Sequence, residues 1–300
     1  MKAMILAAGL GTRLRPLTTK RAKALVPVAN MAVIDRIIRY LKRYGISEIV
    51  VNAHHHHRQV VDHLDKGRQF GIRIEVRVEP EILGTGGGIK NTADFWGPEP
   101  FIVINGDIIT DVDLEKAYKT HLKAKNLATL ILHDYRPFNQ IQIDRHLNIV
   151  DIAAKNHHGR LAFTGIHVID PDILNYIPEE KFSSIIDCYK KLIKSGKPIK
   201  AYISNGSYWN DIGTIRNYIL ANKELIKGDS FLKASDCFIH ETARLKDWAI
   251  IGPKVRLEEG VEIRRSILWE KALIKRGTRI IDSVVTDSRE VKSDLINKIY

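Results

Sequence analysis

The chain has 300 residues, 44% of them apolar and 27% charged, a composition typical of a globular protein and not of a disordered or fibrous one. No apolar run reaches the roughly 18 residues of a membrane span, and two distant cysteines, Cys188 and Cys237, exclude a disulfide framework, so we expect a cytoplasmic protein without membrane attachment. The net charge of +12 suits an anionic ligand such as a nucleotide, or simply a solvated basic surface, and no nucleic-acid recognition motif accompanies it.

Strand-like and helix-like segments alternate through the first 228 residues. An apolar run at Ala3–Ala8 predicts the first strand, and apolar residues at helical spacing in Met31–Gly45 predict a helix that glycine ends. The same patterns predict strands at Ser47–Ala53, Gly71–Glu79, Phe101–Asp107 and Leu127–Leu132, and helices at Gln59–Phe70, Thr85–Phe95 and Asp113–Lys125. This alternation predicts an α/β fold, a mixed but mostly parallel sheet with helices on both faces.

A glycine loop, LAAGLGTRLRP at Leu6–Pro16, follows the first predicted strand. It lacks the lysine of a Walker phosphate loop, and Leu14 stands where a dinucleotide fingerprint needs its third glycine. What remains is a loop whose glycines let a ligand approach the backbone and whose Arg13 adds positive charge. Taken alone, the loop is explained better by a tight turn with surface arginines.

Three further polar clusters interrupt apolar context. They are GTGGGIK at Gly84–Lys90, NGD at Asn105–Asp107 and WNDIGT at Trp209–Thr214. Asp107 and Asp211 each lie at the end of an element, so they can share a Mg²⁺ ion if those ends converge. Taken singly, each acid fits a cap or turn residue better.

Four adjacent histidines, His54–His57, raise the question of a metal site. Neighbouring residues cannot all face one ion, and no acid or cysteine is spaced to complete a ligand shell. The run therefore predicts a loop between a strand and a helix.

From about residue 236 the apolar residues recur with a period of six. One series is Ile239, Leu245, Ile251, Leu257 and Ile263, a second is Ala243, Ala249, Val255, Val261 and Ile267, and a looser third is Leu268, Ile274 and Ile280. A sustained period of six is typical of a hexapeptide β-helix. We expect roughly three coils over residues 236–296, a solenoid small enough to need a partner at one end.

The motifs LAAGLGTRLRPLT, KALVPV, GTGGGI, NGD, FTGIHV and WNDIGT, in this order, resemble the sugar-1-phosphate nucleotidylyltransferases. The resemblance covers residues 1–228 and implies a Rossmann-like catalytic domain there. A C-terminal left-handed β-helix, here residues 236–296, is a common addition in that family. The implied reaction is NTP + sugar 1-phosphate ⇌ NDP-sugar + pyrophosphate, with Mg²⁺ as cofactor.

The resemblance also assigns roles to single positions. It implies that Arg13, Lys23 and Asp107 are catalytic, with Lys23 bridging the phosphates and Gly11, Thr12 and Arg13 holding the leaving ones. The positions implied to face the base and ribose are Leu6, Ala8, Gly9, Glu81, Gly86 and Gly87. The implied metal ligands are Asp107 and Asp211, and the sugar-phosphate contacts are Lys155, Thr164 and Gly165.

Two departures from the family pattern concern Ala24, where proline is usual, and Ala154, where a sugar-binding glutamate is usual. The missing glutamate leaves the sugar open. The layout of the whole chain resembles the mannose-1-phosphate guanylyltransferases, whereas TGGGI with FTGI resembles the N-acetylmuramate-1-phosphate uridylyltransferases and GTGGGIKN the heptose-1-phosphate guanylyltransferases.

We expect GTP and mannose 1-phosphate as substrates, and a homo-oligomer that forms through the β-helix. A rival from another class is a non-catalytic regulatory subunit that binds nucleotide sugars. The presence of Arg13, Lys23, Asp107 and Asp211 together argues against that rival, because a sensor does not need all four.

Overall fold

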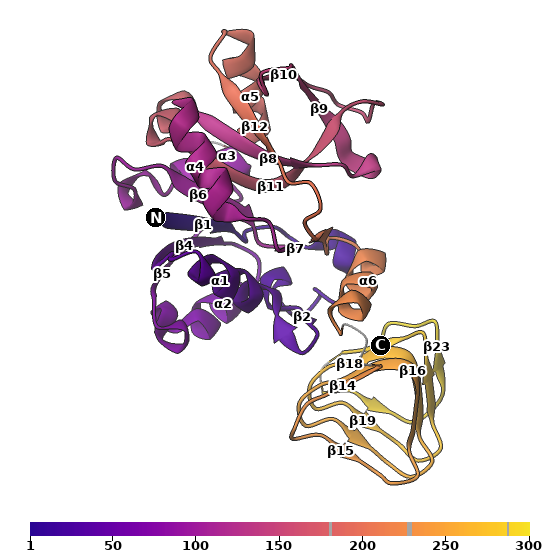
Figure 1. Cartoon of the computed structure of the whole chain (residues 1–300). Coiled ribbons are helices and arrows are strands. Elements are labelled where there is room, and N and C mark those ends of the chain that lie inside the picture. Colours follow the sequence, from indigo (N-terminus) through magenta and orange to yellow (C-terminus); the bar gives the residue numbers. More distant parts are fainter. Residues whose placement is uncertain (180–181, 227–229, 287) are drawn as a thin grey trace. The chain divides into compact units, whose positions relative to one another are not determined.

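The computed structural model describes residues 1–179, 182–226, 230–286 and 288–300 (Figure 1). The chain forms two compact units. The first consists of Met1–Leu10, Ala22–Ala24 and Ile34–Asn210, and the second of Gly11–Arg21, Leu25–Val33 and Asp211–Tyr300. The boundary predicted at residue 228 lies outside the described residues. Packing thus groups two N-terminal segments with the C-terminal part of the chain, a grouping that the linear domain prediction did not contain.

A nine-stranded mixed sheet forms the frame of the first unit. Its strands are β1 (Lys2–Leu6), β4 (Glu48–Ala53), β5 (Arg73–Val78), β6 (Phe101–Asn105), β8 (Ala128–His133), β9 (Asn139–Ile143), β10 (Ile149–Ile152), β11 (Leu161–Ile169) and β12 (Ile199–Ile203). The neighbours β6, β1, β4 and β5 run parallel. Beyond β6, strand β11 runs antiparallel to β6, β8 and β9. The short strands β7 (Ile108–Thr110) and β13 (Trp209–Asp211) pair apart from this sheet.

Helices cover both faces of this sheet. They are α1 (Val33–Arg43), α2 (His57–Leu64), α3 (Gly84–Lys90), α4 (Leu114–Ala124) and α5 (Ile185–Lys194). Met4 and Val103 pack in one apolar cluster with Ile89 of α3 and Tyr189 of α5. Ile5 points to the other face and is buried as well. Figure 1 shows α1 and α2 on one side of β1 and α4 on the other. The predicted fold class is confirmed.

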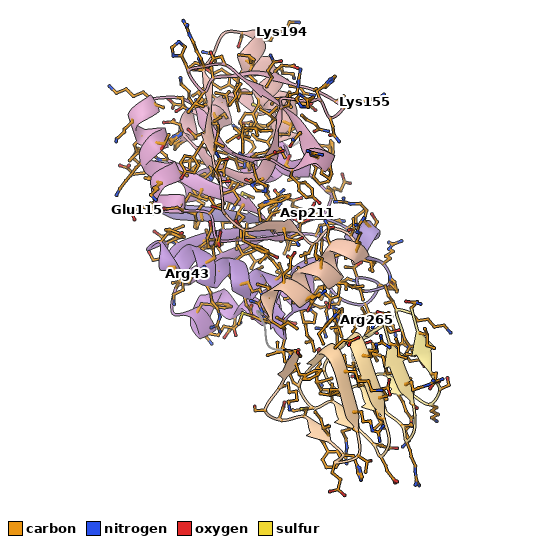
Figure 2. The ribbon with its side chains drawn as sticks, turned by 45° about the vertical axis from the view of Figure 1, so that its right-hand side comes forward. Arg43, Glu115, Lys155, Lys194, Asp211 and Arg265 are labelled. Carbon is orange, nitrogen blue, oxygen red and sulfur yellow. The ribbon has the colours of Figure 1, made fainter. Side chains whose placement is uncertain are left out.

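Helices α1 and α5 end on basic residues: the last residue of α1 is Arg43 and that of α5 is Lys194, both labelled in Figure 2. A positive charge there compensates the partial negative charge of a helix C-terminus. In the part of the chain that the structure describes, no helix combines the length and apolarity that crossing a bilayer requires.

Two predicted helices are wrong as continuous elements. The helix predicted at Gln59–Phe70 ends at Leu64, because Lys66 (φ 54°) and Gly67 (φ 89°) adopt left-handed backbone and a 3₁₀ segment follows. The helix predicted at Thr85–Phe95 ends at Lys90, and a separate 3₁₀ turn covers Ala93–Phe95. In both segments local backbone geometry overrides a helical apolar pattern.

Stability is expected to depend on His121, a buried residue of α4 whose Nδ1 lies 3.0 Å from Thr129 Oγ1. Burial lowers its pKa from 6.5 to about 4, so below pH 6.5 the unfolded chain takes up a proton that the folded chain refuses. Protonation of this histidine in the unfolded chain therefore lowers the unfolding free energy as the pH falls from about 6.5 to about 4. The slope is about 1.4 kcal/mol per pH unit. In urea unfolding, His121→Gln should show a smaller slope of stability against pH in that window, and equal slopes would contradict this.

The second unit contains a β-helix. Its strands are β14 (Phe231–Lys233), β15 (Phe238–Ile239), β16 (Arg244–Ile251), β17 (Arg256–Leu257), β18 (Glu262–Leu268), β19 (Leu273–Ile274), β20 (Arg279–Ile281), β21 (Val284–Val285), β22 (Glu290–Val291) and β23 (Leu295–Ile296). All their pairings are parallel, and Leu245 pairs with Ile263, which pairs in turn with Ile280. These partners lie 18 and 17 residues apart, close to one coil of three six-residue repeats, and the parallel stacking agrees with the predicted β-helix.

The side chains of the β-helix follow the period of six. The predicted positions Ile251, Val255, Leu257, Val261, Ile263, Leu268, Ile274 and Ile280 are all 0% exposed. Outside, corner residues of successive coils stack as ion pairs: Arg265, labelled in Figure 2, donates to Asp247 Oδ2 at 2.6 Å and to Asp282 Oδ1 at 2.6 Å. All three adopt positive φ, so the coil turns the same corner at each level.

The rest of the second unit comprises α6 (Ile215–Leu225), the paired strands β2 (Pro27–Val28) and β3 (Met31–Ala32), and a 3₁₀ turn at Thr12–Leu14. Thr214 caps α6, because its hydroxyl accepts a hydrogen bond from Asn217 N.

Candidate active site

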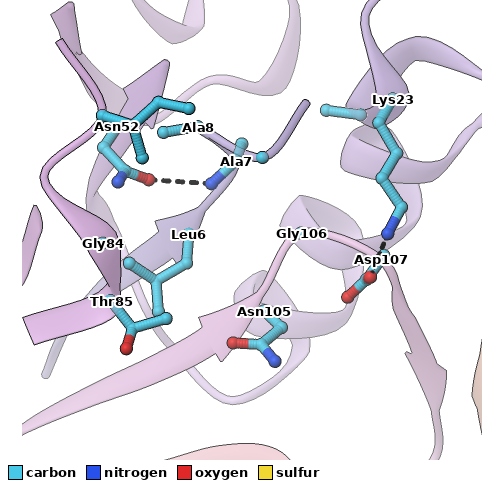
Figure 3. Close-up of a pocket in the computed structure, with 13 residues that line it drawn as sticks. Leu6, Ala7, Ala8, Lys23, Asn52, Gly84, Thr85, Asn105, Gly106 and Asp107 are labelled. Atoms are coloured by element: carbon cyan, nitrogen blue, oxygen red, sulfur yellow. Dashed lines mark hydrogen bonds and ion pairs between the residues drawn. The ribbon is translucent and has the colours of Figure 1, made fainter. Parts of the chain in front are cut away.

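A pocket of about 210 Å³ opens in the first unit where β1 and β6 end (Figure 3). Its lining comes from five places in the sequence: Leu6–Gly9, Lys23 with Ala24, Asn52, and the segments around Ile82–Thr85 and Asn105–Asp107. The carboxyl ends of parallel strands are where α/β folds bind ligands. The predicted glycine loop and the NGD motif both reach this edge.

The close approach of β1 and β6 depends on Gly106. Leu6 pairs with Asn105 in register, and Gly106 N donates to Leu6 O at 2.8 Å. A Cβ at position 106 would lie 2.8 Å from Leu6 O, so any other residue would push the two strand ends apart. The chain segments that leave these strands, including Asp107, therefore emerge at one edge.

An ion pair between Lys23 Nζ and Asp107 Oδ2 lies in the pocket (Figure 3). Lys23 comes from a 3₁₀ turn at Lys23–Leu25, and Asp107 follows β6 directly. Their side chains are 16% and 17% exposed, so both charges are shielded yet reachable from the pocket. An ammonium group binds phosphate oxygens, and a carboxylate binds hard cations.

Asn52 and Glu79 form a buried polar chain that the sequence analysis missed. Asn52 Oδ1 accepts from Ala7 N at 2.7 Å, and Asn52 Nδ2 donates to Glu79 Oε1 at 2.7 Å. Glu79 Oε2 accepts from Leu83 N at 3.1 Å, and Glu79 is 1% exposed. The chain ties the start of the glycine loop to the loop before α3. The sequence signal that could have identified Asn52 and Glu79 is their position: each is a polar residue at the end of a predicted strand, Ser47–Ala53 or Gly71–Glu79.

The GTGGG segment contributes Gly84 and Thr85 to the pocket wall. Gly86 and Gly87 are buried behind that wall, and their N–H groups donate to Ser183 O at 2.9 and 3.4 Å. Glu81 is exposed, and it does not line the pocket. From this part of the chain, Ile82, Gly84 and Thr85 line the pocket, next to the residues that the resemblance named.

Gly11, Thr12 and Arg13 belong to the second unit, as does Asp211 (Figure 2). Gly11 turns the chain with φ 64°, and Thr12 and Arg13 are exposed. A Cβ placed on Gly213 would lie 2.6 Å from Asp211 Oδ1 and 2.9 Å from Arg13 Nη2, so the carboxylate and the guanidinium flank this glycine. The structure thus brings predicted site residues together in two pairs, Lys23 with Asp107 and Arg13 with Asp211.

Thr164 and Gly165 lie beside the pocket. The Thr164 hydroxyl donates to Ile131 O at 2.8 Å, and its carbonyl accepts from Trp209 Nε1 at 2.9 Å. Gly165 has φ 76°, and a Cβ there would lie 2.5 Å from Nδ2 of Asn105, a pocket residue. Lys155 is exposed on the loop after β10 (Figure 2) and is not among the pocket residues.

The carboxylates of Asp107 and Asp211 are suitable ligands for Mg²⁺. Mg²⁺ in phosphoryl-transfer sites is usually held by one or two carboxylates, with water and substrate phosphates completing its shell. Asp107 lines the pocket, and Asp211 Oδ1 accepts from Gly213 N at 2.6 Å at the start of the turn into α6. Each carboxylate is therefore of a kind that suits a hard cation.

His54–His56 lie between β4 and α2, as predicted, and His57 begins α2. His54 Nδ1 is 2.8 Å from Glu79 O, and the rings of His55 and His56 lie 3.9 Å apart. Over residues 1–179, 182–226, 230–286 and 288–300, no three or more His, Cys, Asp or Glu side chains cluster as a metal site would require.

Comparison with known proteins gives matches over most of the chain. Residues 2–228 match the family described as nucleotidyl transferase. A mannose-1-phosphate guanylyltransferase from Mycobacterium tuberculosis is 26% identical, covering 93% of this chain and 80% of its own length. A D-glycero-alpha-D-manno-heptose 1-phosphate guanylyltransferase from Aneurinibacillus thermoaerophilus is 31% identical, covering 75% of this chain and 98% of its own length.

An N-acetylmuramate alpha-1-phosphate uridylyltransferase from Neisseria meningitidis serogroup B is 32% identical, covering 72% of this chain and 94% of its own length. Among solved structures, HddC from Yersinia pseudotuberculosis complexed with GMP-PN superposes with a TM-score of 0.65. It is 26% identical and covers 75% of this chain and 99% of its own.

Proposed function

The chain belongs to the nucleotidyl transferase family, and from that premise we propose that it converts GTP and mannose 1-phosphate to GDP-mannose and pyrophosphate. Its reaction class is that of a sugar-1-phosphate nucleotidylyltransferase. The observation that carries the proposal is the Lys23–Asp107 ion pair, which lies where β1 and β6 end in a pocket lined by glycines.

The proposed reaction is a phosphoryl-type transfer. A phosphate oxygen of the sugar phosphate attacks the α-phosphorus of the nucleotide in line, the bond to the β-phosphate oxygen breaks, and pyrophosphate leaves. Such a reaction needs positioning and charge neutralisation more than covalent chemistry. Lys23 neutralises negative charge on the phosphates, and Arg13 holds the leaving β- and γ-phosphates.

The nucleotide side of the pocket is shaped by backbone. Ala8 and Gly9 follow β1 and face base and ribose, while Ala7 N is already fixed by Asn52. Gly84 and Thr85 form the facing wall. Mg²⁺ held by Asp107 and Asp211 would add positive charge to the phosphates as pyrophosphate departs.

Mannose 1-phosphate and GTP are supported by two comparisons. The mannose-specific relative matches 93% of this chain, including the part that forms the β-helix. A structural neighbour binds a guanine nucleotide analogue, GMP-PN. The rival substrates are supported by higher identity, since the heptose and N-acetylmuramate enzymes reach 31% and 32% over about three quarters of the chain.

A pyrophosphate-release assay tests the proposal. It combines four NTPs with the 1-phosphates of mannose, glucose, heptose and N-acetylmuramate, with Mg²⁺ and with EDTA. We expect the highest kcat/KM for GTP with mannose 1-phosphate, and loss of turnover with EDTA. A higher value for another pair would overturn the substrate assignment. Thermal stabilisation by nucleotide sugar without turnover of any pair would favour the regulatory-subunit rival.

We also propose that the β-helix mediates self-association. Strands β14 and β23 end one sheet of the β-helix and β15 and β22 end the other, and end strands of a solenoid are places where a second copy can pair. Light scattering of the whole chain should then give a mass above that of one 34.1 kDa chain over a range of concentrations. A single-chain mass throughout would contradict this. Truncation is a poor test, because Trp269 of the β-helix donates to the Tyr218 hydroxyl of α6 at 2.8 Å.

A further inference from the structure

Within the second unit, the segment Gly11–Arg21 contacts the β-helix. This segment contains Gly11, Thr12 and Arg13, the residues proposed to hold the leaving phosphates. Arg21, the last residue of this loop, forms an ion pair through Nη2 with Oε1 of Glu270, 249 positions away in sequence. Its guanidinium also lies over the Trp269 ring, 5.0 Å from the ring centroid. Arginine suits this double contact because its planar cation can pair with a carboxylate and stack on an aromatic face at once.

Trp269 is a rigid support for that contact. It is 2% exposed, its N–H donates to Val285 O of the next coil at 2.9 Å, and its Nε1 donates to the Tyr218 hydroxyl. Tyr218 in turn donates to Pro27 O at 3.0 Å. Gly252 of the preceding coil packs so tightly that a Cβ there would lie 2.8 Å from the Trp269 carbonyl carbon. The position of Glu270, the next residue, is therefore set by the β-helix.

The segment Leu25–Val33 is also bound by hydrogen bonds to α6 and the β-helix. Ala29 N donates to Asn222 Oδ1 of α6 at 2.8 Å, and Asn30 Nδ2 donates to Ile251 O of the β-helix at 2.9 Å. Lys23 lies between the two held segments in sequence, two residues after Arg21 and two before Leu25. Both stretches that flank this lysine thus depend on α6 and the β-helix.

We propose that Glu270 and Trp269 are positioning residues for nucleotidyl transfer: through Arg21 they fix the loop that presents Gly11, Thr12 and Arg13 to the β- and γ-phosphates. This inference rests on the proposed function for its kinetic consequence. It assigns the β-helix a direct part in building the nucleotide site, besides any role in assembly.

The kinetic test compares Glu270→Ala with Glu258→Ala. Glu258 is a matched control, because it is also a β-helix glutamate in an ion pair, with Lys275 at 2.6 Å, away from the loop. Misplacing a phosphate-binding loop should raise KM for the nucleotide and lower kcat/KM roughly 10- to 100-fold in Glu270→Ala. Glu270→Gln keeps an acceptor for Arg21, so its kcat/KM should lie between those of Glu270→Ala and the wild type. Glu258→Ala should have the kcat/KM of the wild type.

Amide hydrogen exchange of residues 11–21, measured without nucleotide, gives a readout that does not need activity. Exchange in this loop should be at least several-fold faster in Glu270→Ala than in the wild type or Glu258→Ala. Unchanged exchange, unchanged kinetics, or an equal effect of Glu258→Ala would overturn the inference. A wild type that turns over no substrate pair would instead contradict the proposed function, and loop exchange alone would then decide the positioning role.

Discussion

Replacing Asp107 with alanine is expected to lower kcat/KM for nucleotidyl transfer by roughly 10³-fold, while the protein stays folded. The substitution removes a proposed Mg²⁺ ligand and leaves Lys23 in the pocket without its counter-charge. The fold should survive, because Asp107 follows the end of β6 and its polar side chain lines the pocket. Steady-state kinetics with varied Mg²⁺, together with circular dichroism, measure both parts.

The control for this substitution is Asp94→Ala. Asp94 is an exposed carboxylate of the same unit, paired with Arg77 at 2.7 Å, and its removal should leave turnover unchanged. Asp211→Ala should resemble Asp107→Ala, because both carboxylates are proposed to hold the ion. Near-normal rates in both would remove the metal assignment.

A cycle of Lys23→Ala, Asp107→Ala and the double variant separates the two roles. If lysine and aspartate act in one charge arrangement, the losses of the single variants will not add in the double variant. Fully additive losses would mean that the ion pair has no functional coupling.

Replacing Asn52 with alanine is expected to lower the unfolding free energy by about 3 kcal/mol and to raise KM for the nucleotide. The variant leaves two buried groups without their partner, the Ala7 N–H and one oxygen of the Glu79 carboxylate. Because Ala7 starts the glycine loop and Glu79 holds Leu83 before α3, both walls of the pocket should loosen together.

Urea unfolding and nucleotide KM test this prediction. Asn156→Ala is the matched control, since Asn156 is exposed and its side chain donates to Pro137 O at 2.6 Å. The control should change stability by less than about 0.5 kcal/mol. Equal stability of Asn52→Ala and the control would show that the buried polar chain does not hold the pocket.

The sequence predicts those elements whose buried side chains recur at a regular spacing. Ile251, Leu257 and Ile263 point inward at every sixth position, so their spacing alone predicts the β-helix. The apolar runs of β1 and β6 likewise predicted two central strands whose ends carry the glycine loop and Asp107. Periodicity records which face of an element is buried, and these elements are buried regularly.

Other features depend on a single backbone angle or on single contacts between distant residues, and neither produces a periodic sequence pattern. The break at Gly67 reflects a left-handed backbone angle. Gly86 and Gly87 do not offer their N–H groups to the pocket, because both donate to Ser183 O. Asn52 and Glu79 pair across two strands. The attachment of Arg21 to Glu270 spans 249 positions and has no local signature.

The stacking of the β-helix limits how its length can vary. Ile239 lies over Leu257, which lies over Ile274, which lies over Val291, so each level repeats the one before it. The partners in this column are 18, 17 and 17 residues apart, so the coils differ by one residue while the inward positions stay paired. An insertion or deletion inside a strand would instead turn inward side chains to the outside and break the column. The solenoid can therefore change in length at its corners or by whole coils. Coils added beyond Val291 would leave the proposed contact of Trp269 and Glu270 with Arg21 unchanged.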